Sequence, residues 1–155
     1  MRGKQAPKRP AAPDALYNSP VIGKFINFLM LDGKKNTAQR IVYGAFEIVK
    51  QKEQKDPLEV FELALNNVGP SVEVKTKRVG GSNYQVPIPV KPERKSALAM
   101  RWIINAARAK KGRAMTEKLA EEFMLAAKGE GDAMRKRTDV HKMAESNRAF
   151  AHFAY

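Results

Sequence analysis

The spacing of apolar and polar residues changes along the chain and predicts helices on both sides of one extended segment. Apolar side chains recur with helical period before residue 70 and again after residue 92. Between those regions the period falls to two. The predicted helices run from Ser19-Pro20 to Asp32-Gly33, from Asn36 into the charged run 50–56, from Asp56 to Gly69-Pro70, from Glu93 to Lys111, from the turn at 110–113 to near Gly129, and from Asp132 onward.

Local start signals support these helices. Ser19 and Asp56 are N-cap residues followed directly by proline, and the pair Asn36 and Gln39 resembles a capping box. Asp132 is predicted to cap the last helix. Gly44 lies inside the second helix, where glycine costs about 1 kcal/mol relative to alanine, so we expect a close packing contact there.

The segment 72–90 is predicted to be a β-hairpin. Val72, Val74 and Thr76 alternate with charged residues, the pair Gly80-Gly81 interrupts the pattern, and apolar residues alternate again from Tyr84 to Val90. Strands of roughly seven residues give an arm of about 20 Å, long enough to leave a small body. Pro87 and Pro89 remove two donors from one edge of the second strand, which blocks further pairing. We expect the arm to pack at its base and to become ordered on an acidic partner at its tip.

The predicted helix 93–111 is mostly apolar but carries a stripe of arginines. Arg94, Arg101 and Arg108 are seven residues apart, so they fall nearly on one line at 100° per residue. Arginine is rarely buried without an anionic partner. Chance pairing with Glu59, Glu62 or Glu121 on a solvated face is one interpretation, and phosphate binding is the other.

Composition favours an anionic partner. The 155 residues suit one domain and hold 29 Lys and Arg against 16 Asp and Glu, a net charge of +13. Such a charge favours nucleic acid or an anionic membrane. The longest apolar run, residues 25–31, is too short to span a bilayer, and the N-terminus lacks the apolar core of a signal peptide. The absence of cysteine excludes disulfides and thiolate sites and fits a reducing compartment, so we expect a cytoplasmic protein.

Catalytic chemistry finds no support in the sequence. There is no phosphate-binding loop, and the Gly80-Gly81 pair lies at a hairpin tip rather than at a helix start. His141 and His152 have no accompanying metal-ligand motif, and Glu121 and Glu122 are about 100° apart on a helix. We therefore predict no enzyme activity, no cofactor and no metal.

The ends of the chain also differ in character. Residues 1–18 are predicted to be a basic disordered tail, 19–147 the helical domain that binds the anionic partner, with its arm at 72–90, and 148–155 a C-terminal tail. Glu117, Glu121 and Glu122 should give the fifth helix an acidic surface turned away from phosphates. The basic sixth helix should lie on the binding face. The aromatic residues Phe150, His152, Phe153 and Tyr155 could stack on bases or dock on protein.

Several segments closely resemble bacterial small-subunit ribosomal protein seven. They are the arm sequence VEVKTKRVGG, the following YQVP, the helix sequence ALAMRW, the motif DVHKMAE at 139–145 and AFAH at 149–152. The likeness extends from about Pro13 to the C-terminus. It implies a non-catalytic ribosomal protein that binds the 3′ major domain of small-subunit rRNA, starts assembly of the subunit head, and lies near exit-site tRNA, mRNA and small-subunit proteins nine and eleven.

The predicted binding residues combine the charge pattern with this resemblance. Those expected to contact rRNA are Arg2, Lys4, Lys8, Arg9, Lys34, Lys35, Lys75, Lys77, Arg78, Arg94, Lys95, Arg101, Arg108, Lys110, Lys111, Arg113, Met115, Arg135, Lys136, Arg137 and Lys142. Those expected near exit-site tRNA and mRNA are Lys77, Arg78, Gly80, Gly81, Ser82, Asn83, Tyr84 and Arg148.

The predicted fold is all-α: a six-helix, bundle-like domain with an extended two-stranded hairpin inserted between helices 3 and 4. The predicted function is a structural constituent of the ribosome in the cytoplasmic small subunit, with no membrane contact. A DNA-architectural protein would share the charge and the basic arm, and competition by duplex DNA would identify it. An RNA-modifying enzyme would need convergent acid–base groups or a cofactor loop, and the sequence shows neither.

Overall fold

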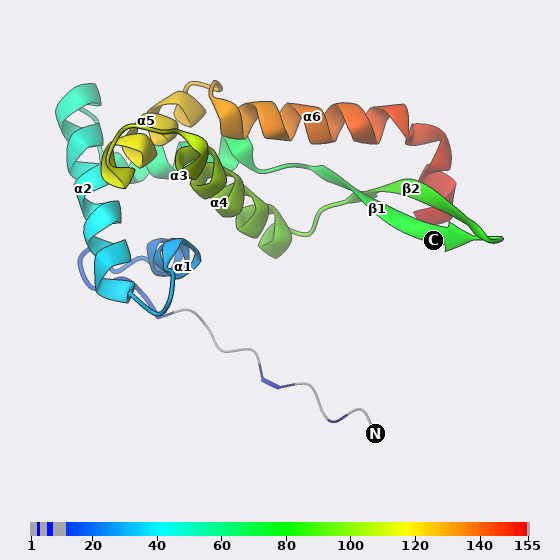
Figure 1. Ribbon diagram of the computed structural model, residues 1–155, viewed down its shortest axis with the longest axis horizontal. Coiled ribbons are helices and arrows are strands. Elements are labelled where there is room, and N and C mark those ends of the chain that lie inside the picture. Colours follow the sequence, from blue (N-terminus) through cyan, green and yellow to red (C-terminus); the bar gives the residue numbers. More distant parts are fainter. Residues whose placement is uncertain (1–2, 4–5, 8–11, 155) are drawn as a thin grey trace. The chain divides into compact units, whose positions relative to one another are not determined.

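A computed structural model describes residues 3, 6–7 and 12–154 of the chain. Over these residues it contains six α-helices, one 3₁₀ helix and one β-hairpin (Figure 1). In chain order the elements are α1 (Pro20–Leu29), α2 (Lys35–Glu53), α3 (Pro57–Val68), β1 (Val72–Val79), β2 (Ser82–Pro89), α4 (Pro92–Ala109), α5 (Met115–Ala127), α6 (Asp132–Ser146) and η1 (Arg148–Ala154). The predicted helices and the inserted hairpin are confirmed.

The chain divides into two compact units, residues 1–40 and residues 41–155. In the first unit, the buried carboxylate of Asp14 accepts hydrogen bonds from the backbone N–H groups of Leu16 and Tyr17 at 3.1 and 3.2 Å. The Asp14 N–H donates to the carbonyl of Ser19, which precedes α1. A Cβ at Gly23 would collide with the carbonyl of Ala12, so the segment before α1 lies directly against this helix.

The core of the second unit is built around three phenylalanines from three helices. The rings of Phe46 in α2, Phe61 in α3 and Phe123 in α5 have centroids 5.4–5.9 Å apart, and each ring is at most 1% exposed. Edge-to-face contacts at this spacing are favourable for aromatic rings. Gly44 explains how α2 approaches α5, because a Cβ there would lie 2.8 Å from Cγ2 of Thr116. The predicted close contact is confirmed.

The start signals of the helices were predicted with mixed success. Ser19 and Asp56 are N-caps, and the Asp56 carboxylate accepts the Leu58 N–H at 2.9 Å. The capping box at Asn36 is wrong, because α2 already begins at Lys35. Asp132 is also not a cap: it is the first residue of α6, and Gly131 precedes it at φ 95°.

The hairpin is antiparallel with a two-residue turn. Val79 pairs with Ser82, and the register runs outward to Val72 opposite Pro89. Gly80 and Gly81 have φ values of 57° and 91°, the positive pair that this turn requires. Counting outward from the turn, both prolines fall on pairs without mutual hydrogen bonds, so their missing donors belong to the free edge of β2. That edge is blocked, as predicted.

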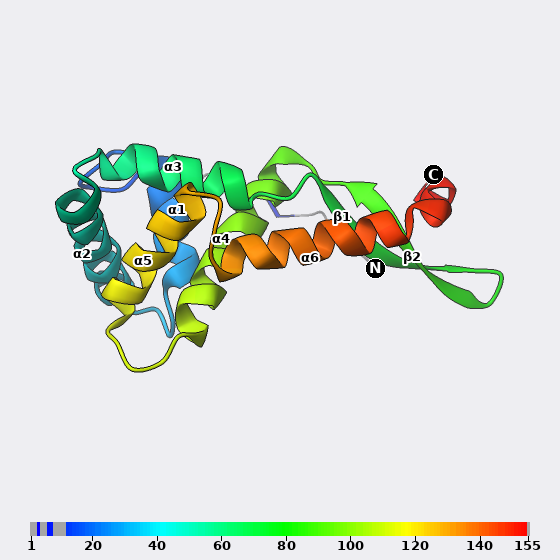
Figure 2. The same ribbon diagram turned by 90° about the horizontal axis from the view of Figure 1, so that it is seen from above.

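The arm is supported along its length by the C-terminal part of the chain. Helix α6 packs against β1, and η1 packs against β2 (Figures 1 and 2). The sequence predicted packing only at the base of the arm. Within the described residues, no helix is both long enough and apolar enough to cross a membrane.

Candidate nucleic-acid interface

The cationic residues of the arm lie on both of its faces. Successive strand residues point to opposite faces, so Lys75 and Lys77 share one face and Arg78 lies on the other. All three are exposed. The Lys77 ammonium donates to the carbonyl of Phe153 at 2.7 Å, and Lys75 Nζ is 3.6 Å from Glu73 Oε1. The tip residues predicted near the exit site, 80–83, are also exposed.

The C-terminal aromatic residues dock on the arm. The centroid of the Tyr84 ring lies 5.2 Å from that of Phe150 and 5.1 Å from that of Phe153. The ring centroids of His152 and Phe153 are 4.0 Å apart. Together with the Lys77 hydrogen bond, these contacts hold η1 on β2. Of the two interpretations left open by the sequence, docking on protein is therefore the one observed, and the protein is the chain itself.

The arginine stripe of α4 is divided between two environments. The Arg94 guanidinium forms a two-pronged contact with Glu73 on β1, with Nε and Nη2 each 3.0 Å from Oε2. The side chain of Arg94 is 49% exposed and that of Glu73 is 12% exposed. Arg101 and Arg108 lie exposed farther along the same helix. The partner of Arg94 is thus Glu73, and not Glu59, Glu62 or Glu121, the acids predicted as chance partners of the stripe.

The basic turn after α4 is largely bound to acidic side chains of α5. Lys110 Nζ lies 3.0 Å from Glu122 and 3.6 Å from Glu121, and Arg113 lies 3.2 Å from Glu121. Lys111 is exposed. The predicted acidic surface of α5 is therefore wrong for Glu122, whose side chain is fully buried.

Glu122 joins three elements at one carboxylate. One oxygen faces Lys110 at the end of α4, and the other accepts the backbone N–H of Ala133 in the first turn of α6 at 3.0 Å. The latter contact satisfies a donor that a helix start leaves open. Gly131 is needed for it twice over, since a Cβ there would lie 2.9 Å from Glu122 Oε1 and its φ is positive.

The remaining predicted residues occupy several surfaces. On α6, Arg135, Lys136 and Lys142 are exposed and Arg137 is half-buried, while Lys95 and Met115 are half-buried. In the first unit, Lys34 and Lys35 line a small hollow of about 250 Å³ together with Gly33, Asn36 and Thr37. The predicted contacts at Arg2, Lys4, Lys8 and Arg9, and the aromatic Tyr155, fall outside the described residues.

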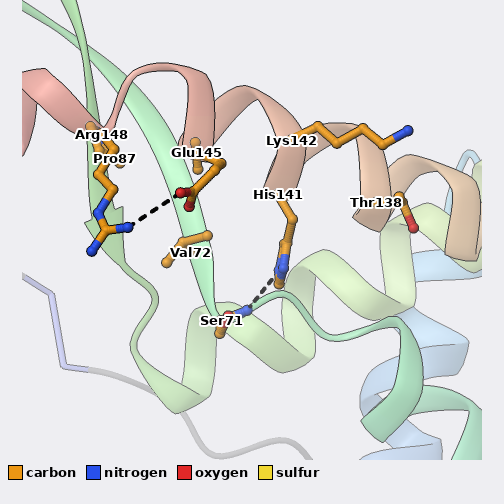
Figure 3. A pocket seen from close by; sticks show the side chains of 9 residues that line it. Ser71, Val72, Pro87, Thr138, His141, Lys142, Glu145 and Arg148 are labelled. Carbon is orange, nitrogen blue, oxygen red and sulfur yellow. Dashed lines mark hydrogen bonds and ion pairs between the residues drawn. The ribbon is translucent and has the colours of Figure 1, made fainter.

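A groove of about 570 Å³ lies between α6 and the base of the arm (Figure 3). Its polar side chains include His141, Lys142 and Glu145 of α6 and Arg148 of η1. The imidazole Nε2 of His141 accepts the backbone N–H of Ser71 at 3.2 Å, just before β1 begins. Burial, with the charge of Arg137 as a second cause, lowers the pKa of His141, which favours the neutral ring that accepts this bond.

Glu122 and Glu73 differ in how clearly the sequence pattern indicates their contacts. Glu122 lies three residues after Leu119 and four before Ala126, on the apolar stripe of α5, so helical spacing alone could have placed it in the core. Glu73 lies on the polar side of the strand pattern. Nothing in that pattern indicated that it would meet Arg94, 21 residues later.

Comparison with known proteins identifies the family. A family model described as ribosomal protein S7p/S5e matches residues 1–148. Proteins named small ribosomal subunit protein uS7 are similar over nearly the whole chain. The one from Thermotoga neapolitana is 56% identical over 155 residues and covers all of both chains. Those from Polynucleobacter asymbioticus and Burkholderia mallei are 53% and 56% identical over 154 residues, or 99% of each chain. The resemblance seen in the sequence is thus confirmed: the chain belongs to the ribosomal protein S7p/S5e family.

Proposed function

We propose that this chain binds the 3′ major domain of small-subunit rRNA directly and nucleates assembly of the subunit head. Its family consists of structural constituents of the ribosome rather than enzymes, and its full-length relatives are small-subunit proteins. In the proposed role the protein contacts rRNA phosphates through its exposed cations. Bases are read only where the RNA strand is unpaired.

The surplus of cationic side chains carries this proposal. Even if each of the 16 acidic residues paired with one cation, 13 Lys and Arg side chains would have no acid in the chain. The ion pairs of Glu73, Glu121 and Glu122 engage cations near the ends of α4. Exposed cations elsewhere lie on the arm and on α6. A polyanion is the partner that neutralises such a distribution.

Salt dependence tests the proposal. If about six phosphates are neutralised, log affinity for a 3′-domain rRNA fragment should fall with log salt at a slope of roughly −4 to −5. Duplex DNA at the same nucleotide concentration should compete poorly. A slope near zero, or equal competition by duplex DNA, would contradict phosphate-based recognition of structured rRNA.

Arg101 provides the matched single-residue test. Arg101→Ala should weaken rRNA binding and reduce the magnitude of the salt slope by about 1, with little change in the free energy of unfolding. Arg94→Ala serves as the contrast, because it removes the partner of Glu73 and should lower stability as well. If Arg101→Ala costs stability but keeps full affinity, the arginine stripe is structural.

We also propose that the arm tip approaches exit-site tRNA and mRNA, with proteins nine and eleven as neighbours in the subunit. The tip can be removed without disturbing η1, because Lys77 and Tyr84 form a hydrogen-bonded pair that a two-residue turn can close. Replacing residues 78–83 by Gly-Gly should leave affinity for the rRNA fragment unchanged and weaken exit-site tRNA binding in reconstituted subunits. Loss of rRNA binding in this variant would show that the two roles are not separable.

A further inference from the structure

The groove between α6 and the arm offers more than positive charge. Its walls include the apolar side chains of Val72, Pro87 and Ala144, and its volume of about 570 Å³ is within the range of ligand clefts. Two exposed cations, Lys142 and Arg148, are among its lining residues. Apolar walls with exposed cations suit a flat heterocycle attached to an anionic group.

His141 contributes a hydrogen-bond donor whose position is set by the fold. Because Nε2 accepts the Ser71 N–H at 3.2 Å, the neutral imidazole must carry its proton on Nδ1. Figure 3 shows His141 reaching from α6 toward Ser71 at the base of the arm. The ring therefore combines a fixed orientation with a second nitrogen that is a donor.

Glu145 contributes the complementary acceptor. Its side chain is 73% exposed, and its Oε1 lies 3.4 Å from Nη1 of Arg148, at the long end of the range for a charged pair (Figure 3). Such an exposed pair adds little stability to the fold. A carboxylate in an otherwise cationic groove weakens general attraction for phosphate, so its presence there fits a role in recognising hydrogen-bond donors on a base.

We propose that this groove binds one unpaired nucleotide of rRNA whose base carries an exocyclic amino group, with guanine as the best match. This inference rests on the proposed function. The Glu145 carboxylate accepts the adjacent N1–H and N2–H of guanine, while His141 Nδ1–H donates to an acceptor on the same base. Lys142 and Arg148 neutralise the flanking phosphates, and the base packs on Val72 and Pro87. Unpaired bases held in this way are how RNA sequence is commonly read.

A substitution that neutralises Glu145 should change RNA affinity in opposite directions for base recognition and for general electrostatic attraction. Removing a negative charge beside RNA should strengthen binding if only charge matters. Glu145→Gln should instead weaken binding of the full-length protein to the 3′-domain rRNA fragment by roughly tenfold, because the bidentate acceptor is lost. Asp139→Asn is the matched control: it is exposed on α6, does not line the groove, and lies about 120° around the helix from Glu145.

Each outcome is decisive. Weaker binding by Glu145→Gln, with equal or tighter binding by Asp139→Asn and unchanged thermal unfolding of both, supports the groove. Equal or tighter binding by Glu145→Gln overturns it while leaving the rRNA-binding function intact. A wild-type protein that does not bind the fragment overturns both proposals together.

Mononucleotides provide a second measurement that does not depend on the rest of the RNA. Guanosine monophosphate should shift the imidazole NMR resonances of His141 in the full-length protein, and the Glu145→Gln variant should lose that shift. Uridine monophosphate and inorganic phosphate should cause little change. An equal response to inorganic phosphate alone would show that the groove binds an anion and reads no base, which would refute the proposal.

Discussion

Glu122 is expected to contribute more to stability than any other ionisable side chain of α5. Its replacement by alanine removes a charge-assisted hydrogen bond to the Ala133 N–H, worth about 1.5–3 kcal/mol. The replacement also leaves Lys110 without this buried carboxylate partner, and its side chain, which is 22% exposed, can regain only part of its hydration. We add roughly 1 kcal/mol for that, below the 3–5 kcal/mol typical of breaking a fully buried pair. Glu122→Ala should therefore cost about 3 kcal/mol.

Two further variants divide this cost between its sources. Glu122→Gln keeps an oxygen that can accept the Ala133 N–H but loses the charge opposite Lys110, so it should cost about half as much. Glu121→Gln is the neighbouring control: that side chain is 39% exposed, and its pairs with Lys110 and Arg113 should be worth less than 1 kcal/mol.

Urea unfolding followed by circular dichroism measures these differences. A loss of about 3 kcal/mol corresponds to a fall in Tm of roughly 6–12 °C for a protein of this size. Because the Ala133 contact involves a fully buried carboxylate, raising the salt concentration should change the Glu122→Ala deficit little. If Glu122→Ala and Glu121→Gln destabilise the protein equally, the buried carboxylate of Glu122 does not hold α4, α5 and α6 together.

Three other variants test separate contacts of the second unit. Gly44→Ala should lower the free energy of unfolding, because the added Cβ would lie 2.8 Å from Cγ2 of Thr116. Adding Thr116→Ser removes that methyl group, so the double variant should recover the loss and gain up to about 1 kcal/mol of helix propensity. Urea midpoints measure both changes. Since the pKa of His141 is lowered in the folded protein, the contribution of its neutral ring to stability is full above the unfolded pKa of about 6.5 and is lost as the pH falls below that value. Stability should therefore drop less from pH 7.5 to 5.5 in His141→Asn than in the wild type. An equal drop in both proteins would exclude this role of His141. Phe153→Ala should release η1 from β2, seen as faster amide exchange in residues 148–154 with α6 unchanged, whereas unchanged protection would mean that the aromatic contacts are not what holds η1.

Local signals in the sequence were enough to predict the order of elements. Helical period placed six helices, and period-two alternation around Gly80-Gly81 placed the hairpin with its blocked edge. These succeed because they depend on neighbours within a few residues. Helix starts were less certain. An N-cap such as Asp56 could be read directly from the sequence. At the start of α6, by contrast, the free N–H of Ala133 donates to Glu122, a residue of another helix that lies ten residues before Asp132. A cap supplied by another helix leaves no local signature.

The support of the arm depended on contacts that no local pattern reports. Aromatic residues near the C-terminus indicated a segment that binds another surface, and both nucleic-acid bases and protein were suitable partners. The choice was made by Tyr84 and Lys77, which face each other across the hairpin some 70 residues earlier in the chain. Aromatic rings stack favourably on either partner, so composition could not decide between them. The structure decides because α6 brings η1 alongside β2.

The distribution of acids, more than that of bases, determines which cations are open to RNA. Net charge gives the surplus of 13 but not its location. Glu73 pairs with Arg94, and Glu121 and Glu122 pair with Lys110 and Arg113. The cations at the two ends of α4 are therefore largely neutralised by carboxylates of the chain itself. A phosphate that binds there must compete with a carboxylate already in place. Among the residues that the structure describes, the exposed cations Arg135 and Lys136 of α6 form no ion pair with an acidic side chain, so the larger losses of rRNA affinity should follow from changing them.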